Sequence, residues 1–234
     1  MNYSYILFDV DNTLIDFKAS FMNAAKKVLA LGGHSTDDAS AEAYFEFNDD
    51  TWFGFELDRI DSEYICKNYH RLYHKYLLTS NERAARQMHL KASPQELTDC
   101  FVRELGALAV PNPNAIEICR LFSKTHTICV ATNGLVHVQP GKLTKFEGMF
   151  RHVFISEAMD CIKPEKEYFR YILNKLGCDS SECLMVGDSL PNDIGGANSS
   201  GIASCYYNPS GLINTTGIIP TYEIKDFNEL RKIV

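Results

Sequence analysis

The chain carries near its start the stretch Tyr5-Ile6-Leu7-Phe8-Asp9-Val10-Asp11-Asn12-Thr13. Its first four residues are apolar and predict a buried β-strand, and two acids follow where that strand should end. Because residues two apart share a face and ligands collect beyond the carboxyl ends of parallel strands, both carboxylates should point into one cleft. One acid can then attack an electrophile or ligate Mg²⁺, while its neighbour, with a pKa raised by the like charge, transfers a proton. The alternative is that the stretch is only a turn, because Asp and Asn are common turn formers.

Apolar runs of strand length recur in the second half of the chain, and amphipathic patterns with a helical repeat separate them. Strands that alternate with helices are joined by right-handed crossovers and form a parallel sheet. The sequence therefore predicts an α/β core with a Rossmann-like parallel sheet. The later strands are expected at residues 127–131, 153–155, 183–186 and 202–206, and helices at residues 114–124 and 164–176.

The segment between the first strand and residue 107 has a different character, because it contains helical patterns and no clear strand. Helices are expected at residues 18–31, 62–78, 81–90 and 94–105. Pro111 and Pro113 mark the return to the core, since proline ends helices and can start the next one. We expect a catalytic core of residues 1–15 and 108–234, with residues 16–107 inserted as an all-helical cap over the cleft.

The composition narrows the class of partner. With 234 residues and 45% hydrophobic content the chain can build a sizeable core. A net charge of -7 argues against nucleic acid or an anionic membrane as the main partner and leaves a small phosphorylated metabolite. The first residues show no targeting signal, and the eight cysteines form no Cys-x-x-Cys pair, so we expect a cytoplasmic protein with reduced cysteines. No sequence feature indicates an oligomeric state.

Two further polar groups follow core strands. The segment Ala131-Thr132-Asn133-Gly134 offers a hydroxyl and a flexible turn whose backbone N–H groups can hold an oxyanion. Lys163 stands before Pro164 at a strand-to-helix junction, where its ammonium can bind a phosphate. Each signal alone has an ordinary alternative, namely loop chemistry for the first and a solvated surface lysine for the second.

A second acidic pair follows the fourth strand of the core. In the segment Gly187-Asp188-Ser189-Leu190-Pro191-Asn192-Asp193, Asp188 can complete a Mg²⁺ site with the first acids. Asp193 can orient water or the lysine, although it can also be a helix cap. Because every one of these groups follows a strand, all of them should project from the same edge of the sheet.

This order of residues resembles the haloacid dehalogenase-like hydrolase superfamily, whose motifs are Asp-x-Asp-x-Thr, a Ser or Thr, a Lys, and Gly-Asp-x-x-x-x-Asp. The resemblance spans the whole chain. The segments Val153–Glu157, Ile162–Pro164 and Leu184–Asp188, with the helical cap, are similar to the branch of bacterial pyrimidine 5'-nucleotidases and phosphoglycolate-type phosphatases.

The resemblance implies a role for each motif residue. Asp9 attacks phosphorus to give an aspartyl-phosphate, Asp11 protonates the leaving alcohol and then activates water, and Lys163 offsets negative charge. The cofactor implied is Mg²⁺, held by Asp9, Asp188 and the main-chain carbonyl of Asp11, with Asp193 outside the ligand shell. The phosphate-binding residues implied are Thr132, Asn133, Gly134 and Lys163.

The function implied is a Mg²⁺-dependent phosphomonoester hydrolase acting on a small metabolite, most consistent with a nucleoside 5'-monophosphate. Asp11 argues against a dehalogenase, which uses one attacking aspartate without an acid two residues later. The alternatives are a phosphoglycolate or sugar-phosphate phosphatase, a phosphosugar mutase and a non-catalytic binding protein with this fold.

Substrate choice should lie in the cap, because core residues contact only the phosphate that all substrates share. Trp52, the only tryptophan, is expected in a Gly-containing break between helices, where it could stack on a nucleobase. Phe17, just after the first motif, is a second candidate. The alternative is that these side chains simply pack within the cap.

Overall fold

The computed structural model describes residues 3–234 and divides into two compact units. Unit 1 comprises the residues up to Asp16, Pro111–Val136 and Leu143–Val234, and unit 2 comprises Phe17–Val110 and His137–Lys142. The division expected from the sequence placed Asp16 in the cap and residues 108–110 and 137–142 in the core, whereas here Asp16 belongs to unit 1 and the other two segments to unit 2. The backbone of residues 137–142 packs directly on the rest of unit 2, since a Cβ on Gly141 would lie 2.9 Å from the Cα of Gly106.

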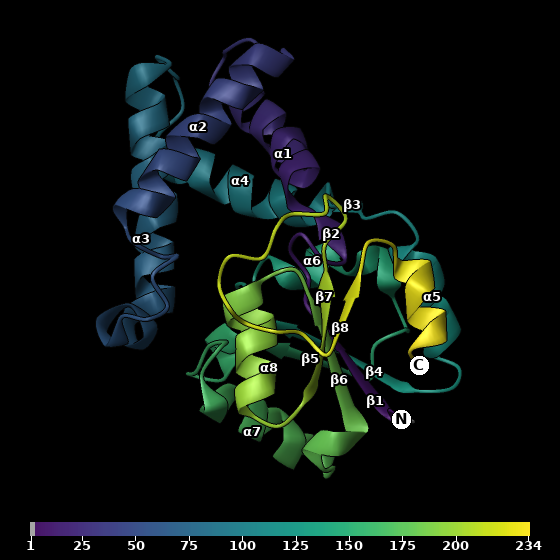
Figure 1. Ribbon diagram of the computed structural model, residues 1–234. Coiled ribbons are helices and arrows are strands. Elements are labelled where there is room, and N and C mark those ends of the chain that lie inside the picture. The colour runs from purple at the N-terminus through teal and green to yellow at the C-terminus, as the bar shows by residue number, and fades with distance from the viewer. Residues whose placement is uncertain (1–2) are drawn as a thin grey trace. The chain divides into compact units, whose positions relative to one another are not determined.

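Unit 1 is built on a parallel sheet of six strands, which confirms the predicted α/β core (Figure 1). The sheet places β1 at its centre, between the two strands that carry most of the polar groups singled out above. In sheet order the strands are β5 (His152–Ile155), β4 (Thr127–Thr132), β1 (Tyr5–Phe8), β6 (Cys183–Gly187), β7 (Ala203–Tyr207) and β8 (Tyr222–Ile224).

Both faces of this sheet are covered, as its apolar strands require. Leu7 belongs to a buried cluster that includes Tyr168 and Phe169, and its neighbour Phe8 contacts the rings of Phe150 and Phe227. Successive side chains of β1 therefore point to opposite faces of the sheet and pack into a separate core on each face. The helices of unit 1 are α5 (Ala115–Phe122), α7 (Lys166–Leu176) and α8 (Gly196–Ser199), with shorter turns η1 (Thr144–Phe146), η2 (Ser156–Ala158), η3 (Ser180–Glu182), η4 (Leu190–Gly195) and η5 (Phe227–Lys232).

Unit 2 is helical and has its own aromatic core. Phe21 contacts the rings of Tyr44, Phe45 and Phe101 at centroid distances of 4.8 to 5.8 Å. Its helices are α1 (Phe17–Leu31), α2 (Asp38–Gly54), α3 (Glu63–Gln87), α4 (Pro94–Ala107) and α6 (Gln139–Lys142). The two-residue strands β2 (Ile15–Asp16) and β3 (Val110–Pro111) lie where the chain leaves and re-enters unit 1.

Some sequence expectations for unit 2 are wrong. Trp52 lies inside α2, not in a break between helices, and α2 was missed because its buried face carries small and polar residues such as Ala41, Asn48 and Thr51. The two helices expected at residues 62–78 and 81–90 are one helix, α3. Asn81 donates its side-chain N–H to the carbonyl of Leu77, a local hydrogen bond that lets a polar residue continue the helix.

Helices long and apolar enough to cross a membrane do not occur within residues 3–234. The strand β8 was also not expected, because three residues give too short a pattern to recognise.

Candidate active site

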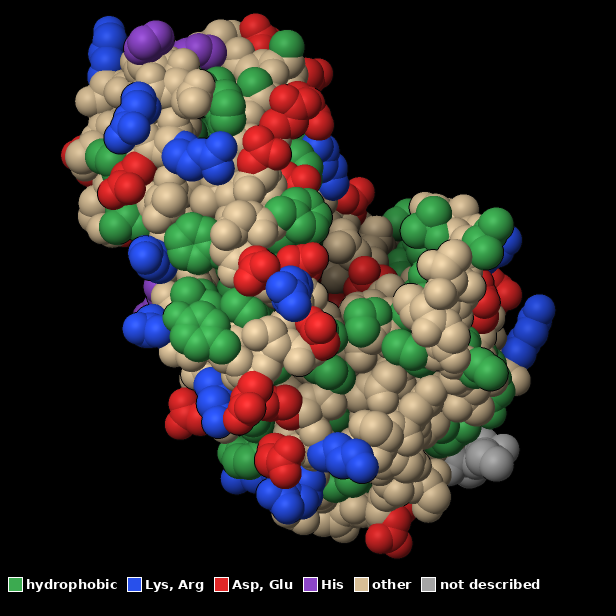
Figure 2. All heavy atoms as spheres, turned by 60° about the vertical axis from the view of Figure 1, so that its left-hand side comes forward, with side chains coloured by type: hydrophobic (Ala, Val, Ile, Leu, Met, Phe, Trp, Pro, Cys, Tyr) green, Lys and Arg blue, Asp and Glu red, His purple; other side chains and the backbone are tan. Residues whose placement is uncertain are grey.

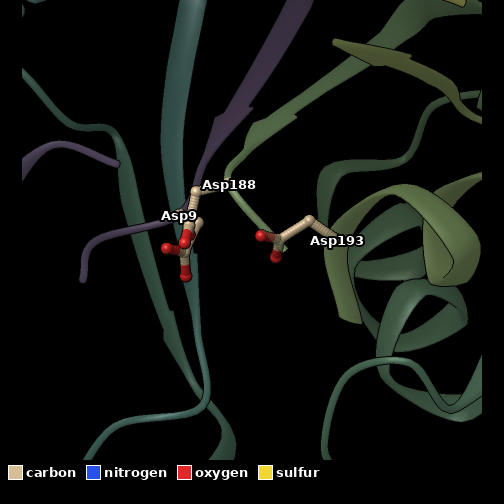
Figure 3. A group of neighbouring side chains, drawn as sticks. All are labelled: Asp9, Asp188 and Asp193. Atoms are coloured by element: carbon tan, nitrogen blue, oxygen red, sulfur yellow. The ribbon is translucent and has the colours of Figure 1, made fainter. Parts of the chain in front are cut away.

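The carboxyl ends of two neighbouring central strands, β1 and β6, bring the predicted acids together. Asp9 follows β1, Asp188 follows β6, and the π-helical turn η4 carries Asp193. One oxygen from each of these carboxylates lies within 4.8 Å of the others. Figure 3 shows the Asp193 carboxylate pointing toward those of Asp9 and Asp188.

Lys163 lies at the centre of this cluster and is only 2% exposed. Its ammonium donates hydrogen bonds to Asp9 Oδ1 at 2.6 Å, Asp193 Oδ1 at 2.7 Å and the carbonyl oxygen of Ala131 at 2.7 Å. An ammonium has three N–H groups, so these bonds use all of them. Lys163 is therefore not a solvated surface lysine, which was the alternative raised from the sequence.

Asp193 is fixed by contacts on both of its carboxylate oxygens. Oδ1 accepts from Lys163, and Oδ2 accepts from the backbone N–H of Ser189 at 3.0 Å. Its side chain packs directly against Gly187, where an added Cβ would lie 2.6 Å from Asp193 Cβ. The glycine at the end of β6 is therefore required for Asp193 to reach the lysine.

Asp188 is held by Thr13, a residue of the first motif to which the sequence assigned no role of its own. The Thr13 hydroxyl donates to Asp188 Oδ1 at 3.2 Å and accepts from the Asp188 backbone N–H at 3.0 Å. Thr13 is fully buried, so this pair links the loop after β1 to the loop after β6. Asn112 supports the first loop by donating to the Thr13 carbonyl at 2.7 Å.

The loop after β4 forms a turn beside this cluster. Thr132 is buried at the end of β4, and its hydroxyl oxygen accepts from the backbone N–H of Gly134 at 3.1 Å. Asn133 makes two hydrogen bonds with the main chain of Lys163, at 2.8 and 2.9 Å. Tyr168, another residue without a role in the sequence interpretation, donates its buried hydroxyl to the Phe154 carbonyl at 3.0 Å.

Burial and mutual repulsion change the acidity of these groups. Burial raises the pKa of Asp9 to about 7 against the opposing charge of Lys163, and the charges of Asp193 and Asp11 are part of that rise. Burial and the charges of Asp9 and Asp193 also raise the pKa of Asp188 well above its usual range. Burial lowers the pKa of Lys163, but the charges of Asp193 and Asp9 outweigh it and raise that pKa above the ordinary lysine value. One ammonium serves several carboxylates, so the site carries excess negative charge.

That excess charge suits a divalent cation. Asp9, Asp188 and Asp193 offer only oxygen ligands, the type that Mg²⁺ prefers. Both oxygens of Asp193 are already bonded to Lys163 and Ser189, so Asp9 and Asp188 are the better candidate ligands. The donor set present therefore fits Mg²⁺.

The remaining predicted residues lie in two places. Asp11 is partly exposed in the loop after β1, two residues from Asp9. Phe17 begins α1 in unit 2, where its ring lies 6.0 Å from that of Phe21. Trp52 contacts the rings of three α3 tyrosines edge to face, at centroid distances of 5.3 to 6.5 Å: Tyr69, Tyr73 and Tyr76.

Charges of both signs are interspersed on the face of the molecule drawn in Figure 2. Neither Lys and Arg nor Asp and Glu form a continuous stripe there. A continuous basic stripe is the usual electrostatic footprint of a nucleic-acid-binding protein, so this face lacks that feature.

Comparisons with known proteins place this chain among the following relatives. The family model for haloacid dehalogenase-like hydrolases matches residues 3–201. Pyrimidine 5'-nucleotidase PynA of Streptococcus pneumoniae is 30% identical over 98% of this chain and 94% of its own, and pyrimidine 5'-nucleotidase YjjG of Escherichia coli is 28% identical over 100% and 99%. The crystal structure of the HAD-hydrolase YfnB from Bacillus subtilis, bound to magnesium, superposes with a TM-score of 0.83 at 26% identity and covers 100% of this chain and 99% of that one.

Proposed function

The chain belongs to the haloacid dehalogenase-like hydrolase family, and from that premise we propose that it is a Mg²⁺-dependent phosphatase that hydrolyses nucleoside 5'-monophosphates. The observation that carries the proposal is the ion pair between Lys163 Nζ and Asp9 Oδ1 at 2.6 Å, with Asp188 beside it. A buried carboxylate next to an ammonium and a candidate metal ligand is suited to attack on a dianionic phosphate ester.

In the first half of the reaction, an Asp9 carboxylate oxygen attacks phosphorus and forms an aspartyl-phosphate. The bond between phosphorus and the substrate's ester oxygen breaks, and Asp11 gives its proton to that oxygen. Lys163 already neutralises part of the charge on Asp9, so the nucleophile and the phosphate can approach each other.

In the second half, Asp11 has become a carboxylate and can take a proton from water. The hydroxide that results attacks the aspartyl-phosphate, releases inorganic phosphate and restores Asp9. We assign the phosphoryl oxygens to the Thr132 hydroxyl and the backbone N–H of Asn133. Gly134, whose N–H donates to the Thr132 hydroxyl, would hold that hydroxyl in place, and Lys163, whose three N–H groups are already bonded, would act on the phosphate through its charge. The buried position of Thr132 at the end of β4 supports this assignment.

Asp9 and Asp188 would hold Mg²⁺ together with the main-chain carbonyl of Asp11. When bound, the cation supplies positive charge that offsets repulsion between these carboxylates and the phosphate. Asp193 would remain outside the ligand shell and orient Lys163, in agreement with its 2.7 Å hydrogen bond to the ammonium.

The preference for nucleotides is supported by the two relatives named pyrimidine 5'-nucleotidase, which align over nearly the whole chain. The test is a screen with Mg²⁺ that measures release of inorganic phosphate from nucleoside 5'-monophosphates, sugar phosphates and phosphoglycolate. We expect pyrimidine nucleoside monophosphates to give the highest kcat/KM. Phosphate release that requires a sugar bisphosphate activator would instead identify a mutase.

The covalent mechanism makes a separate prediction about Asp9. Asp9→Asn keeps the shape of the side chain but removes the nucleophile, so we expect kcat to fall at least about a thousandfold, which corresponds to roughly 4 kcal/mol of activation free energy. Asp50→Asn, at an exposed position of α2, is the matched control and should keep full activity. Near-normal turnover of Asp9→Asn in the same assay would refute covalent catalysis.

A further inference from the structure

The side chain of Asn133 is bonded to the peptide groups on both sides of Lys163 Cα. Its Oδ1 accepts from the Lys163 backbone N–H at 2.8 Å, and its Nδ2 donates to the Lys163 carbonyl at 2.9 Å. The two bonds run in opposite directions between the same pair of residues, so they fix the lysine backbone in position and orientation. A side chain that only filled space would not need both.

The site depends on where that backbone lies. Lys163 Nζ makes three hydrogen bonds of 2.6 to 2.7 Å, to Asp9, Asp193 and the Ala131 carbonyl. A shift of the Lys163 backbone would have to be absorbed by the side chain, which is 2% exposed and held at its end by these three hydrogen bonds. The carbonyl acceptor, Ala131, lies on β4 two residues before Asn133, so the same segment holds the lysine at both its backbone and its ammonium.

We propose that Asn133 is the positioning residue that sets the place of the catalytic ammonium, and that its side-chain amide does not bind the substrate phosphate. The inference rests on the proposed phosphatase function and assigns a role within it. Only the backbone N–H of Asn133 then remains for a phosphoryl oxygen. The loop after β4 thus has two functions, because it binds the phosphate and holds the lysine that neutralises charge.

The chain contains a matched control for this contact. Asn208, which is 3% exposed and follows β7, accepts from the Leu212 backbone N–H at 2.8 Å and donates to the Leu212 carbonyl at 2.9 Å. The geometry is the same reciprocal amide-to-backbone pairing, but Leu212 belongs to a loop that carries none of the acids. Asn208→Ala should therefore cost stability without changing the chemistry.

The experiment compares kcat and KM of Asn133→Ala, Asn133→Asp and Asn208→Ala with those of the wild type, using the best substrate from the screen. Asn133→Ala removes both hydrogen bonds, and Asn133→Asp keeps the shape but sets a carboxylate oxygen against the Lys163 carbonyl. We expect kcat to fall in both Asn133 variants, on the order of a hundredfold for a misplaced catalytic group, with KM changed much less. Asn208→Ala should keep kcat and KM.

A second measurement tests whether Asn133 acts through the lysine. In a Lys163→Met background, where the ammonium is absent, Asn133→Ala should change the remaining kcat by less than about twofold, because the two effects are not additive. An undiminished effect in that background, or a rise in KM with unchanged kcat, would overturn the assignment and indicate direct phosphate binding. If the wild type is active and the Asn133 variants keep its kcat and KM, this inference alone is refuted. If the wild type releases no phosphate from any ester, the proposed phosphatase function is refuted.

Discussion

At the scale of single residues, the site is a compromise between burial and charge. Lys163 is shared by Asp9 and Asp193, and Asp188 accepts a hydrogen bond from the Thr13 hydroxyl. A buried carboxylate without a full countercharge holds its proton more tightly than one in water. A cation bound at the site would therefore favour the ionised form of these carboxylates and lower their pKa values.

This arrangement predicts how stability depends on pH and Mg²⁺. The pKa of Asp9 is about 7 in the folded protein, against an ordinary value near 3.8, so the folded state binds its proton more tightly than the unfolded state does. The stabilising contribution of the protonated Asp9 carboxyl to the free energy of unfolding is then fully present below about pH 4 and is lost as the pH rises through about 7. Mg²⁺ binds the ionised carboxylates, so its stabilising effect should grow over the same interval.

Thermal unfolding with and without Mg²⁺ at pH 5 and pH 8 measures this effect. At about one hundred times the dissociation constant, a ligand stabilises by about 2.7 kcal/mol, which corresponds to a rise in Tm of roughly 5 to 10 °C for a chain of this size. We expect that rise at pH 8 and a much smaller one at pH 5. Asp188→Asn should abolish it, and a rise that is equal at both pH values would show that Mg²⁺ binds elsewhere.

At the scale of elements, the loops of the site are held by close backbone packing as well as by hydrogen bonds. Gly196, the first residue of α8, lies against Phe169 of α7 and against Pro164, which follows Lys163. A Cβ added at Gly196 would clash with the Phe169 ring, because it would lie 2.9 Å from Phe169 Cζ. It would also lie 2.9 Å from Pro164 Cα. Gly195, one residue earlier and also in a helical conformation, has more room, because the nearest atom to its added Cβ is Ile218 Cδ1 at 3.3 Å.

The two glycines form a matched pair of substitutions. Gly196→Ala should destabilise the protein by about 1–3 kcal/mol, the usual cost of overpacking, and should lower activity because Pro164 follows Lys163 directly. Gly195→Ala should be neutral or slightly stabilising, because Ala favours a helix more than Gly does by roughly 0.5–1 kcal/mol. Urea denaturation measures both, and equal effects at the two positions would contradict the packing argument.

The same scale shows what the sequence could predict. The strand runs were recognisable because they are short, apolar and followed by polar residues, and that pattern also located Asp9, Thr132 and Asp188. The roles of Thr13, Asn133 and Tyr168 were not accessible, because each depends on a partner between 14 and 175 residues away in the chain. α2 was missed for a different reason. Its buried face carries polar residues such as Asn48 and Thr51, whose side chains are satisfied by hydrogen bonds to backbone carbonyls of the same helix, so it lacks an apolar helical pattern.

At the scale of the whole molecule, the acids and the lysine all belong to unit 1, and the residues expected to select the substrate belong to unit 2. The two units have separate cores, one on the sheet and one around Phe21. This division predicts that substitutions in unit 1 change kcat for every phosphate ester, whereas substitutions in unit 2 distinguish one ester from another.

Trp52 tests that division. If its ring stacks on a nucleobase, Trp52→Ala should lose about 1–3 kcal/mol of binding, a rise in KM of roughly 5- to 150-fold for nucleoside monophosphates. KM for phosphoglycolate, which has no base, should not change. Trp52→Phe keeps an aromatic ring against Tyr73 and Tyr76 and should retain most of the affinity. If Trp52→Ala lowers thermal stability but leaves the ratio of kcat/KM between the two substrates unchanged, Trp52 only packs α2 against α3, and specificity has to come from other residues.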